Sequence, residues 1–279
     1  MDEKSHELRK SVREHYAEVA RQGSSCCTSP AVAASNCCGL SGVEEVGSAI
    51  GYSKDEMAAV PEGANLGLGC GNPLAFAELK EGDVVVDLGS GAGFDCFIAA
   101  PKVGPSGRVI GVDMTADMIE RARKNAQKAG TANVEFRLGE IEHLPVADNS
   151  ADMIISNCVI NLSTDKPQVF REALRVLKPG GRLMVSDLVL KRPLPESVRE
   201  SVEAYAGCIS GAMLREDYLQ AMRDAGFADV EVAAEGSYPI GAINPDTSEL
   251  ATLAAGLPPE DVADAADSVV SVKVRATKR

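Results

Sequence analysis

The fold class is decided by residues 84–93, VVVDLGSGAG, where an apolar run meets a glycine-rich turn. The run at 84–88 predicts a strand buried on both faces, because it lacks the polar alternation of a half-exposed strand. The glycines let the backbone turn closely into a helix at the carboxyl edge of a sheet. This alternation of strand and helix continues along the chain and predicts an α/β fold with a doubly wound, mostly parallel sheet. Further strands are expected at 108–113, 134–138, 152–158 and 182–188, and helices near 116–129 and 167–177.

The segments before this core are short, and they contain many of the cysteines. Residues 4–20 predict one amphipathic helix, with apolar residues at roughly helical spacing among charges. A small, polar, turn-rich stretch follows at residues 23–39. Ser53 and Glu56 then have the spacing of a capping box, which predicts a short helix that ends before Pro61. We expect residues 1–74 to form an N-terminal helix and a cysteine-rich arm that covers the functional site.

The region after residue 190 departs from the regular alternation. Helical segments near 195–206 and 214–225 precede two alternating strands, 229–234 and 269–276, which suit an antiparallel edge pair. The expected organisation is therefore a cofactor-binding core at 75–190, followed by cap helices and antiparallel edge strands at 191–279.

The charge of the chain limits its partners. A formal net charge of −13 and a pI near 4.8 make the protein acidic. Such a surface repels phosphate backbones and anionic lipid, so we expect neither nucleic acid nor a membrane as partner, and a small molecule instead. The sequence has no apolar run of about 18 residues and no apolar segment behind its charged first residues, which predicts a cytoplasmic protein. Eight cysteines in a reducing compartment then need either burial or a chemical role.

The glycine loop predicts a site for a nucleotide-like cofactor. Phe94 stands where the dinucleotide-binding pattern requires a third glycine, so a bound pyrophosphate is less well supported. Asp113 lies twenty residues past Gly93 at the end of the second strand, where a carboxylate accepts hydrogen bonds from ribose hydroxyls. Asp87 adds a negative charge beside the loop, which favours a ligand with an ammonium or sulfonium group over a phosphate.

Three segments carry a resemblance to a known family. Residues 84–95 (VVVDLGSGAGFD), 111–115 (GVDMT) and 139–141 (GEI) resemble the first three motifs of class I S-adenosylmethionine-dependent methyltransferases, which have a Rossmann-like fold. The resemblance extends over residues 75–190 and implies S-adenosylmethionine as cofactor. It also implies these contacts: Gly89 and Gly91 beneath the methionine part, Asp113 on the ribose, Met114 and Ile141 on either side of the adenine, and Glu140 near the adenine amino group.

Three cysteines from distant segments form the second predicted site. Cys158 ends the fourth strand, so it should face the ligand crevice together with Asn157. Cys70 and Cys208 lie in the segments best able to cover that crevice. Three thiolates would make a soft, three-coordinate pocket, and trivalent arsenic is a soft centre that fits it. Zinc fits less well, because it prefers four ligands, usually delivered in closely spaced cysteine pairs.

A narrower resemblance supports this interpretation. Residues 156–162 (SNCVINL) and 69–71 (GCG), with Cys208 before Ile-Ser-Gly-Ala, resemble arsenite methyltransferases over residues 8–230. The resemblance implies arsenic(III) held by Cys70, Cys158 and Cys208, with arsenite and methylated arsenicals as substrate and products. It also implies a fourth, redox-relay thiol on the N-terminal arm, for which Cys26 and Cys27 are candidates and Cys37 and Cys38 form a second adjacent pair. Thioredoxin or glutathione would be the reductant, and we expect a monomer.

Two other interpretations stay open at this point. The chain could be an ordinary small-molecule C- or O-methyltransferase whose cysteines only pack, as we expect for Cys96, which lies among Phe97, Ile98 and Ala99. It could also be a thiol-based metalloid-binding protein without activity. The intact glycines and Asp113 argue against that last alternative.

Overall fold

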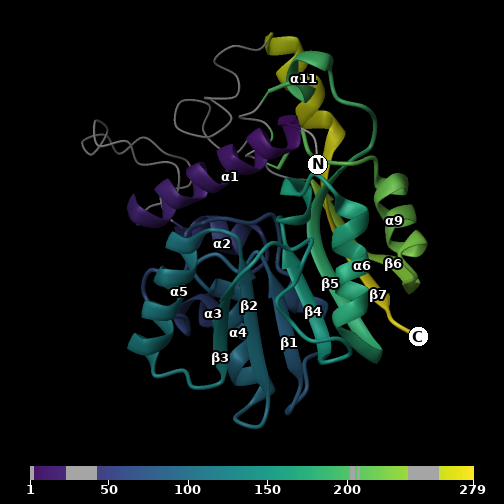
Figure 1. Ribbon diagram of the computed structural model, residues 1–279. Coiled ribbons are helices and arrows are strands. Elements are labelled where there is room, and N and C mark those ends of the chain that lie inside the picture. Colours follow the sequence, from purple (N-terminus) through teal and green to yellow (C-terminus); the bar gives the residue numbers. More distant parts are fainter. Residues whose placement is uncertain (1–2, 23–42, 202–204, 206–207, 238–257) are drawn as a thin grey trace.

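The computed structural model shows one seven-stranded sheet with helices on both faces (Figure 1). It describes residues 3–22, 43–201, 205, 208–237 and 258–279. The strand order is β3-β2-β1-β4-β5-β7-β6, in which the first five pair in parallel and β7 runs antiparallel between β5 and β6. The predicted doubly wound sheet with an antiparallel edge pair is therefore confirmed. The described elements are α1 (Glu3–Gln22), α2 (Val43–Ala49), α3 (Lys54–Ala58), η1 (Pro73–Phe76), β1 (Val84–Leu88), α4 (Phe94–Val103), β2 (Arg108–Asp113), α5 (Ala116–Ala129), β3 (Val134–Leu138), β4 (Ala151–Asn157), η2 (Ile160–Leu162), α6 (Lys166–Val176), β5 (Leu177–Leu190), α7 (Glu196–Arg199), α9 (Arg215–Asp224), β6 (Ala228–Ser237), α11 (Pro259–Ser268) and β7 (Val269–Thr277).

The apolar run of β1 explains why the sheet has a hydrophobic core on each side. Successive side chains of a strand point to opposite faces. Val86 therefore packs with Phe170 of α6 on one face. Val85 packs with Phe97 of α4 on the other face. Burial on both faces fixes the sheet in the centre, so the loops at its carboxyl edge are held by a rigid support.

Outside the core, the observed elements differ from the predicted ones in length and number. The helix expected at 195–206 is described only as α7, and residues 202–204 and 206–207 lie outside the described part. The strand expected at 182–188 is longer, since β5 runs from Leu177 to Leu190 and pairs with β7 from Arg182 to Leu190. Helices α2 and α11 were not predicted, because both are short and rich in small or acidic residues. The cysteine-rich arm at 23–39 lies outside the described residues.

Helix α1 lies across the carboxyl edge of the sheet (Figure 1). Its Arg9 donates to Thr164 Oγ1 at 3.3 Å and to a carboxylate oxygen of Glu142 at 3.1 Å. At its other end, the carbonyl oxygen of Ala20 accepts a hydrogen bond from Arg121 of α5 at 2.8 Å. These contacts join loops after several strands to one helix, so α1 forms a roof over the carboxyl edge.

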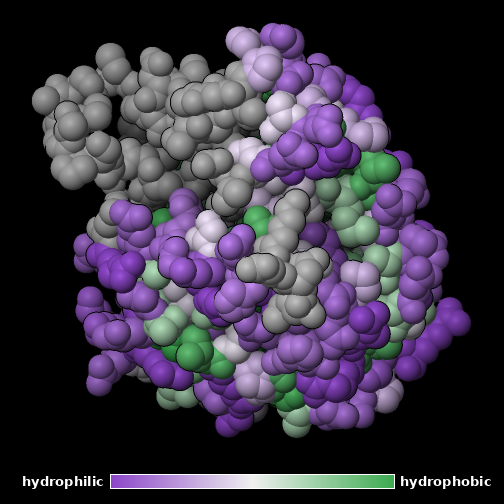
Figure 2. Space-filling model, turned by 45° about the horizontal axis from the view of Figure 1, so that its top comes forward, coloured by the Kyte–Doolittle hydropathy of each residue, from purple (hydrophilic) through white to green (hydrophobic). Residues whose placement is uncertain are grey.

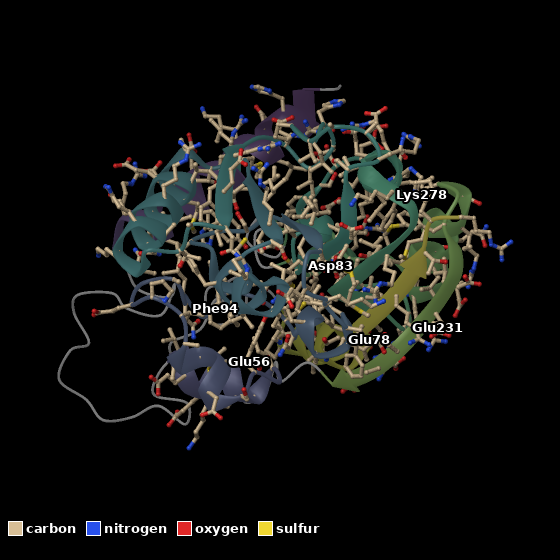
Figure 3. All side chains as sticks on the ribbon, turned by 90° about the horizontal axis from the view of Figure 1, so that it is seen from below. Glu56, Glu78, Asp83, Phe94, Glu231 and Lys278 are labelled. Carbon is tan, nitrogen blue, oxygen red and sulfur yellow. The ribbon has the colours of Figure 1, made fainter. Side chains whose placement is uncertain are left out.

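The opposite edge and the surface are polar. Arg182 forms ion pairs with Glu78 at 3.6 Å and with Asp83 at 3.9 Å, and Figure 3 shows both acidic residues from that side. Figure 2 shows a mainly hydrophilic face on which apolar residues form separate patches. Within the described part, no helix is long and apolar enough to cross a membrane.

Candidate active site

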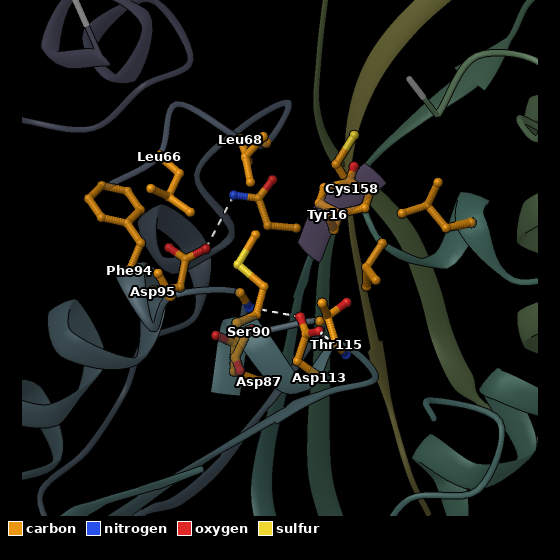
Figure 4. Close-up of a pocket in the computed structure, with 18 of the residues that line it drawn as sticks. Tyr16, Leu66, Leu68, Asp87, Ser90, Phe94, Asp95, Asp113, Thr115 and Cys158 are labelled. Carbon is orange, nitrogen blue, oxygen red and sulfur yellow. Dashed lines mark hydrogen bonds between the residues drawn. The ribbon is translucent and has the colours of Figure 1, made fainter. Parts of the chain in front are cut away.

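A cavity opens at the carboxyl edge of the sheet, beneath α1. Its walls come from the loops after β1, β2, β3 and β4, from α1, and from the glycine-rich segment at 64–69. In the view of Figure 4, Asp95 and Phe94 lie on the left of the cavity, and Cys158 and Tyr16 lie on the right. The cavity therefore has one side built by the first two strand–helix loops and another side that contains thiols.

The glycine loop after β1 is shaped by close approaches that only glycine allows. Gly89 has φ +65°, and a Cβ there would lie 2.3 Å from Cγ2 of Val159. Gly91 has φ +51°, and a Cβ there would meet nothing within 4 Å. Both glycines line the cavity, so the loop is fixed against the segment after β4 at one end and leaves open space at the other, as a backbone that passes close to a ligand requires.

Asp113, at the end of β2, is oriented by two backbone groups. Its Oδ2 accepts the N–H of Gly91 at 3.0 Å, and its Oδ1 accepts the N–H of Thr115 at 2.8 Å (Figure 4). Burial raises the pKa of the Asp113 carboxyl, and these two hydrogen bonds act in the opposite direction. The carboxylate thus joins the loops after β1 and β2 and lines the cavity at the position predicted for ribose recognition.

Two buried carboxylates, Asp87 and Asp95, also line the cavity. Tyr52 donates to Asp95 Oδ1 at 2.6 Å, Asn157 donates to Asp95 Oδ2 at 3.2 Å, and Cys96 donates to Asp87 Oδ2 at 3.2 Å. Burial raises the pKa of Asp95 to about 6. Burial and the neighbouring Asp95 raise the pKa of Asp87 well above its ordinary value. Because the described donors to both groups are neutral, this side of the cavity favours a cationic ligand.

Of the three predicted thiols, that of Cys158 lies beside each of the other two at the wall of the cavity. Cys70 and Cys158 place their Sγ atoms within 4.8 Å of each other, and the Cys158 thiol interacts with those of both Cys70 and Cys208. Cys158 and Cys208 line the cavity, whereas Cys70 lies beneath its surface, 3% exposed. Cys208 donates to the carbonyl oxygen of Cys158 at 2.8 Å. Burial raises the pKa of Cys70, and contacts with the other two thiols raise that of Cys158 well above its ordinary value, so both are thiols at neutral pH.

The backbone at two of these cysteines has a positive φ, a conformation that residues other than glycine rarely adopt. Cys158 has φ +57° and Cys208 has φ +62°. A non-glycine residue in this region costs on the order of 1–3 kcal/mol, and such residues cluster at functional sites. Of the three predicted thiols, the two that line the cavity are thus the ones in this conformation, which Glu78, Asn149 and Asp229 also adopt elsewhere in the described chain.

Asn157 connects the thiol side to the rest of the site. Its Oδ1 accepts the backbone N–H of Cys70 at 3.1 Å, and its Nδ2 donates to the carbonyl oxygen of Gly71 at 2.8 Å. The same Nδ2 contacts Tyr52 and Asp95. Asn157 was predicted to face the cofactor, and it does line the cavity, but its side chain is also what holds the Cys70 loop against β4.

Asp187 is a site residue that sequence reasoning missed. It is fully buried on β5, and one of its carboxylate oxygens lies within 4.8 Å of the Sγ atoms of Cys70 and Cys158. Burial raises its pKa to about 7, although the Leu188 N–H and the Tyr218 hydroxyl donate to it. The signal in the sequence was a single carboxylate inside the apolar run of residues 183–190. Tyr52, Asp95 and Arg9 were missed as well, since only contacts across the fold bring them to the site.

The other predicted residues have different positions. Met114 and Ile141 line the cavity, but Glu140 does not appear among its walls. Its carboxylate forms ion pairs with Arg9 at 3.2 Å and with Arg13 at 3.5 Å, and the neighbouring Glu142 lines the cavity in its place. The adenine contact of Glu140 stays a prediction, and in the structure its side chain is held by α1. Cys96 is fully buried, as expected. Cys27 lies outside the described residues, as do Cys26, Cys37 and Cys38.

Comparison with known proteins agrees with the geometry of the site. The family model described as "Methyltransferase domain" matches residues 79–226. A glycine loop after β1 and a carboxylate at the end of β2, in a doubly wound sheet with this match, define the class as S-adenosylmethionine-dependent methyltransferases.

More similar relatives narrow the class. An arsenite methyltransferase of Halobacterium salinarum is 49% identical over 235 residues, which are 83% of this chain and 60% of that protein. One of Aquipseudomonas alcaligenes is 40% identical over 80% of this chain and 62% of its own length. The crystal structure of an arsenic(III) S-adenosylmethionine methyltransferase from Chlamydomonas reinhardtii is 34% identical, covers 84% of this chain and 73% of that chain, and superposes with a TM-score of 0.61. The chain therefore belongs to the arsenite methyltransferase family, and it spans about 60% of the length of the curated relatives named here.

Proposed function

We propose that this protein transfers methyl groups from S-adenosylmethionine to arsenic(III) held by Cys70, Cys158 and Cys208, and so converts arsenite into methylated arsenicals. The observation that supports the proposal is that the Cys158 thiol lies beside those of Cys70 and Cys208, from two distant segments, at the wall of a cavity whose other side has the features of a cofactor site. The names of the relatives support arsenite as the substrate.

The cavity fits S-adenosylmethionine. Gly91 leaves open space where the loop faces the cavity, and Asp113 presents an oriented carboxylate at the edge of that space. Met114 and Ile141 supply apolar surface for a base. The cofactor supplies a methyl group on a positively charged sulfur, and the two buried carboxylates Asp87 and Asp95 make this side of the cavity suitable for a cation.

The thiols of this chain suit arsenite binding without an external base. Arsenite carries three hydroxyl groups, and each thiol that forms a sulfur–arsenic bond gives its proton to one departing hydroxyl group, so three water molecules leave. The raised pKa values of Cys70 and Cys158 keep those protons available at neutral pH. Arsenic with three sulfur ligands keeps a lone pair at the apex of its pyramid. Cys158 and Cys208 face the cavity, so they direct that lone pair toward the space in which the methyl group must lie for an in-line transfer.

Repeated methylation needs a source of electrons. Methyl transfer formally oxidises arsenic to the pentavalent state, and two thiols that close into a disulfide return two electrons to it. We assign the fourth thiol of this cycle to Cys27, with Cys26, Cys37 and Cys38 as the other candidates on the N-terminal arm. Thioredoxin or glutathione then reduces the disulfide by thiol exchange.

Turnover in the presence of arsenite tests the proposal. The full chain is mixed with S-adenosylmethionine, arsenite and a thiol reductant, and methylated arsenicals are measured by mass spectrometry. We expect product from the unmodified chain and from Cys96→Ser, whose thiol is buried beside Asp87 and keeps a donor after substitution. Cys158→Ser should lower the rate by at least about 100-fold, because a hydroxyl group is a poor ligand for a soft centre. A folded, cofactor-binding chain that gives no methylated arsenical would overturn the proposal.

A further inference from the structure

We infer that Cys70, Cys158 and Asp187 form a second kind of site at the same place, for a thiophilic divalent cation with tetrahedral preference, Zn²⁺ or Cd²⁺. The sequence argued against such a cation because a fourth ligand was missing, and the structure supplies Asp187. The inference rests on the thiols of the proposed function but requires no methyl transfer.

The distances suit such a cation. One oxygen of Asp187 and the Sγ atoms of Cys70 and Cys158 all lie within 4.8 Å of one another. Zn²⁺ binds thiolates at about 2.3 Å, so two sulfurs of a tetrahedral site are separated by about 3.8 Å, and small side-chain rotations bring the three groups to ligand distances. The Cys208 thiol interacts with that of Cys158 but lies outside this group of three ligand atoms, so it completes the tetrahedron only by moving toward the cation.

The Asp187 carboxylate is oriented by several hydrogen bonds, as the carboxylate ligands of metal sites are. Its Oδ1 accepts Nδ2 of Asn161 at 2.8 Å and the N–H of Leu188 at 2.9 Å, and its Oδ2 accepts the hydroxyl of Tyr218 at 3.1 Å. Such outer hydrogen bonds orient the ligand and are typical of metal sites. In the described part of the chain these donors are all neutral, so the carboxylate is buried beside two thiols without an ion pair.

A positive side chain lies near enough to offset the negative charge of the occupied site. A divalent ion bound by thiolates and a carboxylate leaves excess negative charge, which a nearby ammonium group can offset. The half-buried Lys166, whose ammonium donates to the carbonyl oxygen of Ser163 at 2.9 Å, interacts electrostatically with both Asp187 and Cys208.

The two ligands use the residues differently. Arsenic(III) needs three sulfurs and keeps a lone pair, so it leaves Asp187 unused. A tetrahedral cation needs a fourth donor and takes the carboxylate. Because Cys70 and Cys158 are shared, zinc or cadmium excludes arsenite and acts as an inhibitor of its methylation. Asp187 then determines the sensitivity to divalent ions and leaves arsenite affinity nearly unchanged.

Cadmium titration tests this inference. The full chain is used with Cys26, Cys27, Cys37 and Cys38 changed to serine, so that signals come from the four described cysteines. Cd²⁺ binding is followed by the ultraviolet thiolate-to-cadmium charge-transfer band, and arsenite is then added as a competitor. We expect one cadmium ion for each chain, displaced by arsenite.

Asp187→Asn should weaken the affinity for cadmium at least about tenfold, since even outer-sphere partners of a metal contribute 10–100-fold. It should change the affinity for arsenite by less than about threefold. The control Cys96→Ser should change neither the cadmium affinity nor the arsenite affinity.

A second readout keeps the test decisive if Asp187→Asn does not fold. The ¹¹³Cd resonance of the parent protein should fall upfield of an all-sulfur site, as expected for a mixed sulfur–oxygen environment. An all-sulfur resonance, or unchanged cadmium affinity in Asp187→Asn, would overturn the inference alone. A protein that binds cadmium in this Asp187-dependent way but does not bind arsenite would support the inference and overturn the proposed function.

Discussion

The two sides of the cavity are built by different means. The cofactor side is formed by the backbone of two adjacent strand–helix loops, in which Asp113 and the N–H of Gly91 are separated by 22 positions. The thiol side is formed by side chains from three separate regions, and the hydrogen bond from Cys70 to Asn157 joins residues 87 positions apart. Local glycine geometry determines the first side, and packing of the complete fold determines the second. The two sides should therefore respond to different substitutions.

The largest effect is expected on the cofactor side, from Gly89→Ala. The new Cβ would lie 2.3 Å from Val159 at a positive φ. Backbone strain and overpacking together cost on the order of 2–6 kcal/mol, so either the loop moves or the protein loses stability. We expect S-adenosylmethionine binding, measured by isothermal titration calorimetry, to be lost.

Gly130→Ala is the matched control for this substitution. Gly130 has nearly the same φ, +64°, but a Cβ there meets nothing within 4 Å. It should cost only about 1–2 kcal/mol of stability and leave cofactor affinity unchanged. Equal loss of binding in both variants would mean that backbone strain alone is responsible, and that the close approach to Val159 has no role.

A smaller effect is expected at the connection between the two sides, from Asn157→Ala. The substitution removes the acceptor for the Cys70 N–H and the donor to the Gly71 carbonyl oxygen, so the Cys70 loop loses its position on β4. Arsenite affinity should fall roughly 10–100-fold, as for other residues that orient ligands. Cofactor affinity should change much less, because Gly91 and Asp113 keep their contact.

Asn133→Ala is the control for this substitution. The Nδ2 of Asn133 also donates to two carbonyl oxygens, but Asn133 lies outside the site. Equal weakening of both ligands in Asn157→Ala would contradict a thiol-specific role.

The same difference explains what could be predicted from the sequence. Strand β1, the glycine loop and Asp113 follow from a continuous apolar run and from fixed spacing, and the sheet followed from them. The thiols were predicted from soft-ligand chemistry and a resemblance; in the structure Cys158 lies beside both Cys70 and Cys208, and their role as arsenic ligands stays a prediction. Asp187 could not be found in this way, because a single polar residue in an apolar segment does not reveal its neighbour across the fold, and the sequence around Tyr52 gives no sign of its contact with Asp95. The ion pair of Glu140 with Arg9 of α1 could not be found in this way either, because local sequence pointed only to the cofactor and α1 comes from a distant segment.

The smallest effect on binding is expected from Asp95→Asn, where charge can be separated from shape. The amide keeps the volume, and after a flip its oxygen can accept from Asn157 while its nitrogen donates to the Tyr52 oxygen. Removing the negative charge should weaken S-adenosylmethionine binding, because the ligand is a cation. The effect should be only about three- to tenfold, because the interaction between the two charges is partly screened.

The stability of Asp95→Asn should change in the opposite direction. Burial raises the folded-state pKa of Asp95 to about 6, so the folded protein binds more protons than the unfolded chain between about pH 4 and pH 6. The contribution of this group to stability is therefore present at low pH and is lost as the pH rises through 6. Asp95→Asn should match the parent near pH 4 in thermal unfolding and exceed it at pH 7.

Asp152→Asn supplies the control of opposite sign. Partial burial raises the pKa of Asp152, but hydrogen bonds from Lys178 and the Val84 N–H outweigh it, and its pKa is lowered. This carboxylate stabilises the fold above its unfolded-state pKa, and that contribution is lost as the pH falls through its folded-state pKa. Asp152→Asn should therefore unfold more easily than the parent at pH 7 and approach it in acid, with cofactor affinity unchanged. If Asp95→Asn showed the same pH profile as Asp152→Asn, the Asp95 charge would stabilise the fold. It would then not be a destabilising buried charge that a bound cation could neutralise, and the argument for cation binding on the cofactor side would fail.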